Sequence, residues 1–240
     1  MPLSTPPEVT AERLFGPIAS DYDRWSQILG LGRYLYWRRR LVEWTGAGAA
    51  SIVLDVATGT GGVAAELARA SDCRVVGLDQ SRSMLLAARS RQLSAIASAK
   101  VHLVRATAAS LPFADGSFDV VVHTFLLRYA SNPIAMLDEM VRVLRPGGVM
   151  VGLEFAVPKW PWRLAWDLYV GLGLPVAGLL AGPGWFSVGR FLKRSIEGFY
   201  RLHPLPVQLS WWSDAGIDQV ETMTMSLGGA VLIKGVRRGG

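Results

Sequence analysis

The stretch VLDVATGTGG, residues 53–62, constrains the fold of this chain more than any other part of it. It begins as an apolar run that carries an acid at Asp55, and it then places three glycines within four positions, at Gly59, Gly61 and Gly62. Glycine lets the backbone turn sharply and lets a small molecule approach it closely. We therefore expect a strand that ends in a ligand-binding loop, followed by a helix.

The segments after this loop repeat the alternation of strand and helix. Their strands are nearly continuous apolar runs, which indicates a parallel sheet covered by helices on both faces. Residues 217–237 alternate around Gly228 and Gly229 and predict a hairpin that adds antiparallel strands. The expected class is α/β, with a Rossmann-like, doubly wound, mostly parallel sheet and an antiparallel C-terminal hairpin. The predicted strands are 51–56, 74–79, 101–106, 118–125 and 149–155, and the predicted helices between them are 63–70, 83–97 and 134–144.

Two regions outside the alternation predict helices. Residues 8–46 favour one helix at about 9–22 and a second at about 31–45 that ends at Gly46. Six of the nine tryptophans lie between residues 158 and 212, with few charges and several separate glycines and prolines, which favours an aromatic helical insertion. We expect one domain over residues 1–240, made of an N-terminal helical flap (8–46), a cofactor-binding core (51–155), a helical lid (156–212) and final strands (217–237).

Composition narrows the classes of partner. The formal net charge is +6, yet only 18% of the residues are charged and the arginines form short clusters such as Arg38 to Arg40. A nucleic-acid surface would need a longer basic stripe, so we expect no nucleic-acid partner. The single cysteine, Cys73, excludes an internal disulfide, and scattered acids without paired histidines or cysteines predict no metal site.

The N-terminus lacks the pattern of a secretory signal, and we expect a cytoplasmic protein. The longest apolar run, 168–181, has about 14 residues, fewer than the ~20 that cross a bilayer. Tryptophans beside basic residues in the insertion have two explanations, a packed lid or a surface that meets lipid. The composition thus leaves peripheral contact with the inner face of a membrane open.

The identity of the ligand depends on more than the glycine loop, which fits a dinucleotide and an adenosyl-methionine group equally well. Asp79 ends the second predicted strand and suits a carboxylate that accepts both ribose hydroxyls, again for either ligand. Residues 110–122 lead from an acidic turn into a strand, and residues 143–148 give a helix end, a proline stop and a glycine turn. A domain that binds NAD has no reason to carry both features, so they favour S-adenosylmethionine.

These segments carry a resemblance to a known group. In order and spacing, LDVATGTG, GLDQSRSML, ATAASLPFADGSFD and EMVRVLRPGG resemble class I S-adenosylmethionine-dependent methyltransferases. The segments FGPIASDYDRWSQILGLGRYLYWRRRLV, FLLRY, LEFAVP and FLKRSIEGFYRLHP resemble the ubiquinone/menaquinone biosynthesis C-methyltransferase family, over about residues 13–235. The resemblance implies methyl transfer from S-adenosylmethionine to carbon or oxygen of a hydrophobic, ring-containing acceptor such as a demethylated quinone precursor. The resemblance is also compatible with a homodimer.

The resemblance assigns the cofactor-binding residues. It places the glycine loop at the methionine part, Asp79 at the ribose, Thr107 and Ala108 at the adenine edge, and Thr124 at the end of the pocket. Met84 either packs on the purine or is plain helix core. The full predicted set is Asp55, Gly59, Thr60, Gly61, Asp79, Gln80, Met84, Thr107, Ala108 and Thr124.

Three residues are candidates for the chemistry. Arg128 follows a sheet strand and is expected to favour a phenolate or polarise a water, unless it is a surface arginine. Tyr22, beside Asp23, resembles the family's flap over the cofactor, or else it anchors a helix end. His203 precedes a proline in a loop that is expected to fold over the substrate. The remaining candidate base, His123, is expected to be a hydrogen-bonded structural residue.

Two departures from the family pattern keep other functions open. The quinone enzymes show Phe-Gly-x-Arg-Asn where residues 125–129 read FLLRY, and the wider class often has Asp or Asn where this chain has Thr107. One alternative is a methyltransferase for a phospholipid amine or a secondary metabolite. The other is a protein that binds the cofactor without turnover.

Overall fold

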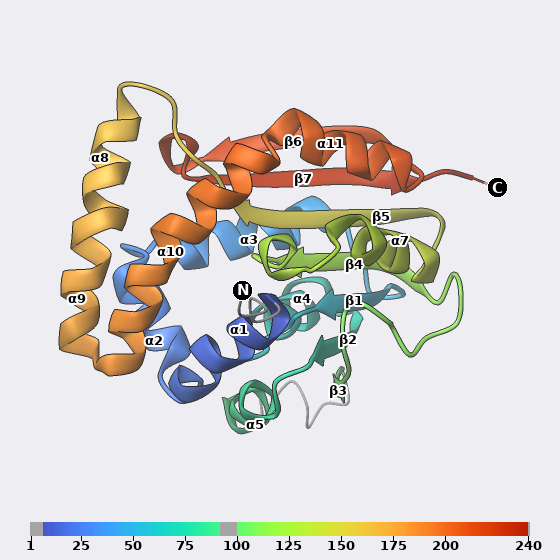
Figure 1. Cartoon of the computed structure of the whole chain (residues 1–240). Helices are drawn as coiled ribbons and strands as arrows, with labels where there is room; N and C mark the ends of the chain where they lie inside the picture. Colours follow the sequence, from blue (N-terminus) through green and yellow to red (C-terminus); the bar gives the residue numbers. More distant parts are fainter. Residues whose placement is uncertain (1–6, 92–99, 240) are drawn as a thin grey trace, which may run out of the picture.

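A seven-stranded sheet in the order β3-β2-β1-β4-β5-β7-β6 runs through the centre of the protein (Figure 1). The computed structural model describes residues 7–91 and 100–239. The order reverses direction at β1, which is the arrangement of a doubly wound sheet. The strands are β1 (Ile52–Val56), β2 (Arg74–Asp79), β3 (Val101–Arg105), β4 (Phe118–Thr124), β5 (Leu144–Phe155), β6 (Ile217–Met225) and β7 (Ala230–Arg237).

The first five strands are parallel, as the sequence predicted. Leu54 in the central strand β1 lies opposite Val76 of β2 and Val121 of β4. Because both faces of β1 are covered, its side chains from 53 to 56 are all buried. The carboxyl ends of these strands therefore meet at one edge of the sheet, and the loops that follow them lie together.

The last two strands form the predicted antiparallel hairpin. β7 pairs with β5 on one side and with β6 on the other, both antiparallel. β5 begins earlier than expected, because Leu144 pairs with Phe118 before a register shift leads to the pair Val149 and Val120. Residues 145–148, predicted as a turn between helix and strand, are therefore an irregularity within β5, where Gly147 has a φ of 73°.

Helices bury the two faces of the sheet in separate apolar cores. On one face, Leu41 of α3 and Leu67 of α4 pack with Val53. On the other face, Leu137 of α7 and Trp212 of α11 pack with Leu54 and its neighbours. The doubly wound fold is thus confirmed. The helices concerned are α3 (Arg33–Thr45), α4 (Gly62–Ser71), α7 (Pro133–Val143) and α11 (Leu205–Asp214), and α5 (Arg82–Arg91) follows β2.

The N-terminal region differs from the two helices that the sequence predicted. The expected helix at 9–22 is divided into α1 (Pro7–Phe15), a 3₁₀ turn η1 (Gly16–Ile18) and α2 (Tyr22–Leu29). Pro17 has no N–H and cannot continue α1, which explains the break. The second predicted helix is confirmed as α3. The predicted helix at 83–97 is described only as far as Arg91, and its remainder lies outside the described residues.

The insertion forms a helical hairpin beside the strand ends. A continuous helix, Trp162–Ala181, consists of α8 (Trp162–Leu168), a π-helical turn η3 (Tyr169–Gly173) and α9 (Leu174–Ala181). It has 20 residues and is longer than the apolar run predicted from sequence. By length and composition it is the one helix of the described residues that is long and apolar enough to cross a membrane. The return helix is α10 (Pro183–Leu202).

Glycines allow the two arms of this hairpin to pack closely. A Cβ on Gly178 would lie 2.8 Å from the carbonyl oxygen of Trp185, and one on Gly189 would lie 2.9 Å from that of Leu174. The predicted lid extended to residue 212, but Trp211 and Trp212 belong to the core beneath the sheet. In the structure the lid therefore ends with α10.

Candidate active site

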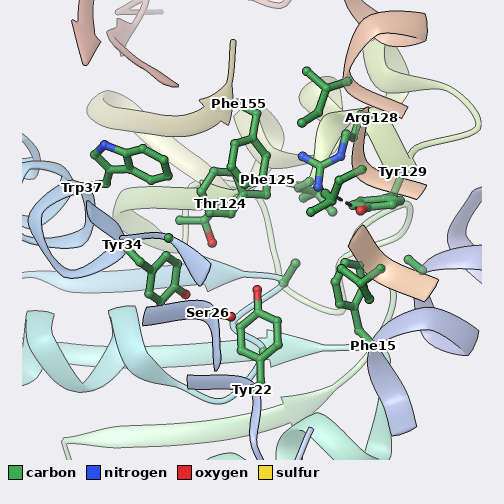
Figure 2. Close-up of a pocket in the computed structure, with 18 of the residues that line it drawn as sticks. Phe15, Tyr22, Ser26, Tyr34, Trp37, Thr124, Phe125, Arg128, Tyr129 and Phe155 are labelled. Carbon is green, nitrogen blue, oxygen red and sulfur yellow. Dashed lines mark hydrogen bonds between the residues drawn. The ribbon is translucent and has the colours of Figure 1, made fainter. Parts of the chain in front are cut away.

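A cavity of about 640 Å³ lies at the carboxyl ends of the parallel strands, within the range of about 300–1,000 Å³ that small-molecule sites occupy. Loops after β1, β2, β3 and β4 form its floor, and residues of α1, α2, α3 and the lid hairpin close it. Figure 2 shows labelled side chains of α1, α2, α3, the end of β4 with the segment after it, and the end of β5 around one space. The cavity thus depends on contacts between segments that are far apart in the sequence.

The glycine loop after β1 is held by its own hydrogen bonds. Thr58 donates its hydroxyl to Asp55 Oδ2 at 2.6 Å, and the Gly61 N–H donates to the Thr58 carbonyl at 2.9 Å. Gly59 has a φ of 56°, and a Cβ built there would point into open space. Gly59 and Thr60 line the cavity, whereas Gly61, the residue before α4, does not.

Asp55 lies beneath this loop rather than on the cavity wall. Its side chain is fully buried, and burial raises the pKa of its carboxyl group to about 7. The hydrogen bond from Thr58 acts in the opposite direction and is the smaller effect. The position of Asp55 makes it a support for the loop, not a ligand contact as the sequence predicted.

Asp79 occupies the cavity wall at the end of β2. Its Oδ2 accepts the N–H of Gly59 at 2.8 Å and its Oδ1 accepts the N–H of Ser81 at 2.8 Å. Burial raises the pKa of this carboxyl group, while the two backbone hydrogen bonds lower it. A carboxylate has about four acceptor positions, so each oxygen keeps room for one more donor. Gln80 and Met84 lie beside it on the wall.

Thr107, Ala108 and Thr124 complete the wall on the sheet side. Thr107 is exposed, and its hydroxyl oxygen accepts the Ala109 N–H at 3.3 Å. In Figure 2 the hydroxyl of Thr124 faces the same space as those of Tyr22 and Tyr34. These hydroxyl groups provide polar atoms on the cavity wall.

The start of α2 is bound directly to the glycine loop. Thr60 donates its hydroxyl to Asp23 Oδ1 at 2.8 Å, and Arg91 donates to Asp23 Oδ2 at 2.8 Å. Next to it, the ring of Tyr22 stacks on Trp185 at 6.0 Å. Burial raises the pKa of the Tyr22 hydroxyl above its ordinary value. The segment around Tyr22 therefore covers the cavity.

Arg128 is buried in the cavity wall, which removes its interpretation as a surface residue. It lies in the 3₁₀ turn η2 (Leu127–Tyr129), and its side chain is 4% exposed. The guanidinium rests over the rings of Tyr129 at 4.5 Å and Phe155 at 4.9 Å. Its Nη2 donates to the Tyr129 hydroxyl at 2.9 Å, whereas Nε and Nη1 find no hydrogen-bond acceptor among the described residues. Two donors are thus left for a ligand.

Glu154 supports this turn and was missed in the sequence analysis. It is 2% exposed at the end of β5, and its Oε1 accepts the N–H groups of Leu126 at 2.9 Å and Leu127 at 3.0 Å. Its Oε2 lies 3.9 Å from Nη1 of Arg128. The sequence signal that would have identified Glu154 is the presence of an acidic residue within the apolar segment LEFAVP. The nearby His123 is buried without a hydrogen bond to any described residue, unlike the satisfied histidine that we expected.

His203 does not reach the cavity. It ends α10, and its ring packs edge-on against Phe199 at 5.2 Å and Trp211 at 4.8 Å. These contacts place it between the lid and the core beneath the sheet. The described residues also contain no group of three or more His, Cys, Asp or Glu side chains arranged to hold a metal ion.

Aromatic side chains form the end of the cavity beside Arg128, and the sequence analysis did not single them out. Phe125 stacks on Phe155 at 4.2 Å, and Trp37 of α3 packs edge-on against both at 6.3 and 6.0 Å. Phe125 has a φ of 54°, a left-handed conformation that phenylalanine rarely adopts. Three separate elements bring these rings together (Figure 2). The lid adds Trp162, Trp166, Tyr169, Val170, Leu174 and Leu192.

A family model and individual sequence relatives identify the same family. The model of the ubiE/COQ5 methyltransferase family matches residues 6–237. The chain is 36% identical over 236 residues to a demethylmenaquinone methyltransferase of Clavibacter sepedonicus, covering 98% of this chain and 92% of that one. It is 35% identical over 227 residues to a ubiquinone/menaquinone biosynthesis C-methyltransferase of Dinoroseobacter shibae, covering 92% and 88%.

Solved structures show the same fold. An S-adenosylmethionine-dependent methyltransferase of Thermotoga maritima, described as a possible histamine N-methyltransferase, has a TM-score of 0.64 at 17% identity. The match covers 94% of this chain and 99% of that one. At this sequence identity the similarity establishes the fold alone. Membership of the family rests on the family model and on the sequence relatives.

Proposed function

The chain belongs to the ubiE/COQ5 methyltransferase family, and from that premise we propose that it methylates a ring carbon of a demethylated quinone in its reduced, phenolic form. As a member of this family it is an enzyme that uses S-adenosylmethionine. The observation that carries the proposed acceptor is Arg128, a buried cation with two free donors at an aromatic end of the cavity.

The sheet side of the cavity suits the cofactor. S-adenosylmethionine supplies the methyl group from a positively charged sulfonium. The open space in front of Gly59 lets such a molecule lie against the backbone, and Asp79 retains acceptor positions for two neighbouring ribose hydroxyls. Met84, which is 5% exposed, offers a thioether beside the expected place of the purine. We assign Gly59, Thr60, Asp79, Gln80, Met84, Thr107, Ala108 and Thr124 to cofactor binding.

The aromatic end suits a phenolic ring. A free phenol has a pKa near 10, and a fixed cation beside its oxygen favours the phenolate. Arg128 can donate Nε–H and Nη1–H to that oxygen while Phe155 and Tyr129 hold its guanidinium. Negative charge on the oxygen would increase electron density on the adjacent ring carbon, which would take the methyl group as the bond from that methyl to the sulfonium sulfur breaks and leaves a neutral thioether. The proton displaced from the ring carbon leaves to a water molecule.

The position of Arg128 in the cavity also helps to judge the alternative acceptors. A phospholipid amine is cationic when protonated, and Arg128 at the acceptor end would repel it. A phenolic secondary metabolite would use the same groups as a quinol, so only a comparison of acceptors separates these two. A cytoplasmic location and a homodimer remain predictions. We propose a single functional domain, because the N-terminal helices, the core and the lid all close one cavity.

A labelling experiment tests the proposal. The protein is incubated with S-adenosylmethionine carrying a labelled methyl group and with one of three acceptors: a reduced demethylmenaquinone with a short tail, phosphatidylethanolamine, or a simple phenol. Mass spectrometry of the products locates the label. We expect label on a ring carbon of the quinol alone. Label on nitrogen, or binding of the cofactor without transfer to any acceptor, would replace the proposal by one of the alternatives.

A further inference from the structure

The lid helix Trp162–Ala181 has two opposite apolar faces. The inner face lines the cavity through Trp166, Val170 and Leu174. The outer face carries five aliphatic residues spaced four apart, which places them in a single stripe along the helix. Their exposed fractions run from 52% to 84%. We call this set the lid stripe, and its members are Leu164, Leu168, Leu172, Val176 and Leu180.

Neighbouring residues enlarge the exposed apolar surface. Trp160, which is 86% exposed, and Trp162 stand at the start of the helix. At its middle, the Tyr169 hydroxyl donates to the carbonyl of Leu29, which brings the exposed residues Ile28 and Leu31 next to the lid. Figure 1 shows this helix at the outer edge of the molecule, away from the sheet. A contiguous apolar surface of this kind marks a docking site.

The helix is long enough to span a bilayer, but its inner contacts keep it attached to the protein. Val170 is 5% exposed and Leu174 is 9% exposed, and Gly178 lies against the backbone of Trp185. Asp167 pairs with Arg163 at 2.8 Å. Inserting the helix across a membrane would remove one wall of the cavity and bury these charges. Only its outer face is available to a partner.

The charge around the lid stripe identifies the partner. Between residues 158 and 204 there are six lysines and arginines and only two acids. Both acids are already in ion pairs: Asp167 with Arg163 and Lys193, and Glu197 with Arg163. Four exposed cations are left without an ion-pair partner among the described residues, although Arg190 rests over the ring of Phe186. They are Lys159, Arg190, Arg194 and Arg201.

We propose that the lid stripe and the arginines of α10 dock on the surface of an anionic lipid bilayer, with the helix Trp162–Ala181 lying in the plane of the interface. Aliphatic residues, interfacial tryptophans and flanking cations are the combination that such a surface selects. Arg190, Arg194 and Arg201 are spaced along one face of α10, suited to lipid phosphates. Docking is independent of the acceptor; that a lipid-dissolved quinol then enters beneath the lid rests on the proposed function.

Flotation with vesicles tests the docking. Vesicles of phosphatidylcholine are compared with vesicles in which phosphatidylglycerol replaces part of it, at low and high salt. We expect the protein to float with the anionic vesicles and salt to weaken binding. Arg190→Gln and Arg194→Gln should each weaken it about fivefold. The double variant Leu168→Glu/Leu172→Glu should abolish it, whereas Leu86→Glu, at a residue of α5 that is 56% exposed, should have no effect.

A second measurement locates the contact. Leu172→Cys and Leu86→Cys are labelled with an environment-sensitive fluorophore, since the native Cys73 is buried. Anionic vesicles should shift the emission to the blue at position 172 alone. No flotation of the unmodified protein, equal shifts at both positions, or a lipid-free dimer that Leu168→Glu/Leu172→Glu dissociates would overturn the proposal, the last in favour of a second copy.

The same variants separate docking from catalysis. Leu168 and Leu172 do not line the cavity. With a short-tailed acceptor in lipid-free buffer, Leu168→Glu/Leu172→Glu should turn over at the parent rate. Loss of flotation with retained turnover supports docking through the lid stripe, and loss of both would show that these residues act on the enzyme itself.

Discussion

The two sides of the cavity are built from different interactions. On the sheet side, buried carboxylates fix the backbone: Asp79 binds the N–H of Gly59 and Glu154 binds those of Leu126 and Leu127. On the lid side, aromatic and aliphatic contacts such as Tyr22 on Trp185 predominate. Hydrogen-bonded loops give a fixed geometry, whereas apolar packing adapts to shape. We therefore expect the sheet side to determine the cofactor and the chemistry, and the lid side to determine which acceptor enters.

The largest effect is expected at Arg128. Arg128→Ala should lower kcat by about a hundredfold or more, because a group that assists proton transfer is lost. The affinity for S-adenosylmethionine should stay nearly constant. Arg128→Lys should recover only part of the rate, because an ammonium group lacks the planar donor fork. Arg89→Ala, at an exposed arginine of α5, is the control. Parent turnover in the alanine variant would remove Arg128 from the chemistry.

The second effect concerns the cofactor. Asp79→Ala should weaken S-adenosylmethionine binding by about 1.5–3 kcal/mol, the usual loss for a charged hydrogen-bond acceptor. Asp79→Asn, which keeps one carbonyl oxygen, should lose less. Calorimetry measures both affinities, and NAD should not compete. Unchanged affinity in Asp79→Ala, or tight binding of NAD, would contradict the assignment of the sheet side.

A smaller effect is expected at Glu154, which acts through Arg128. Glu154→Gln keeps an oxygen for the two backbone N–H groups but removes the negative charge 3.9 Å from Arg128. We expect kcat to fall about tenfold, which corresponds to about 1.4 kcal/mol of lost transition-state stabilisation, with KM and cofactor affinity unchanged. Glu154→Ala should instead destabilise the fold by about 1–3 kcal/mol for each unsatisfied N–H. Equal kcat in parent and Glu154→Gln would show that the glutamate is purely structural.

The pH dependence of stability tests the burial of Asp55. Its pKa is raised to about 7, above the unfolded value near 4, so the folded state holds a proton that the unfolded state releases. The free energy of unfolding should fall by about 1 kcal/mol per pH unit between roughly pH 4 and 7 from this group. Asp55→Asn should remove that slope in urea titrations of the cofactor-free protein. Asp138→Asn, at an exposed residue of α7, should keep it.

The difference between the sheet side and the lid side of the cavity also explains which parts of the site could be predicted from the sequence. The glycine loop and Asp79 follow directly from local pattern, because strand, turn and helix signals lie within a short stretch. The aromatic wall does not, because pairing of β4 with β5 and packing of α3 bring Phe125, Phe155 and Trp37 together. The same pairing brings Glu154 to the turn that carries Arg128.

The same limit applies at the lid. His203 lies within a family-like segment, yet the course of α10 places it against Trp211 instead of the cavity. Trp211 and Trp212 lie within a tryptophan-rich stretch, but tertiary packing buries them beneath the sheet. Composition predicted an aromatic lid and could not assign each ring to the lid or to the core. Pro17, in contrast, is a local signal for the break before α2, although the predicted helix at 9–22 ran through it.

The different roles of the sheet side and the lid side are tested most directly by measuring acceptor affinity as a function of tail length, at saturating S-adenosylmethionine. If the lid side selects an apolar acceptor, each added methylene that becomes buried should improve apparent affinity by up to about 0.8 kcal/mol, until the tail leaves the cavity. Trp166→Ala should flatten this trend without changing cofactor affinity. A flat response in the unmodified protein would contradict the account and point to a small polar acceptor.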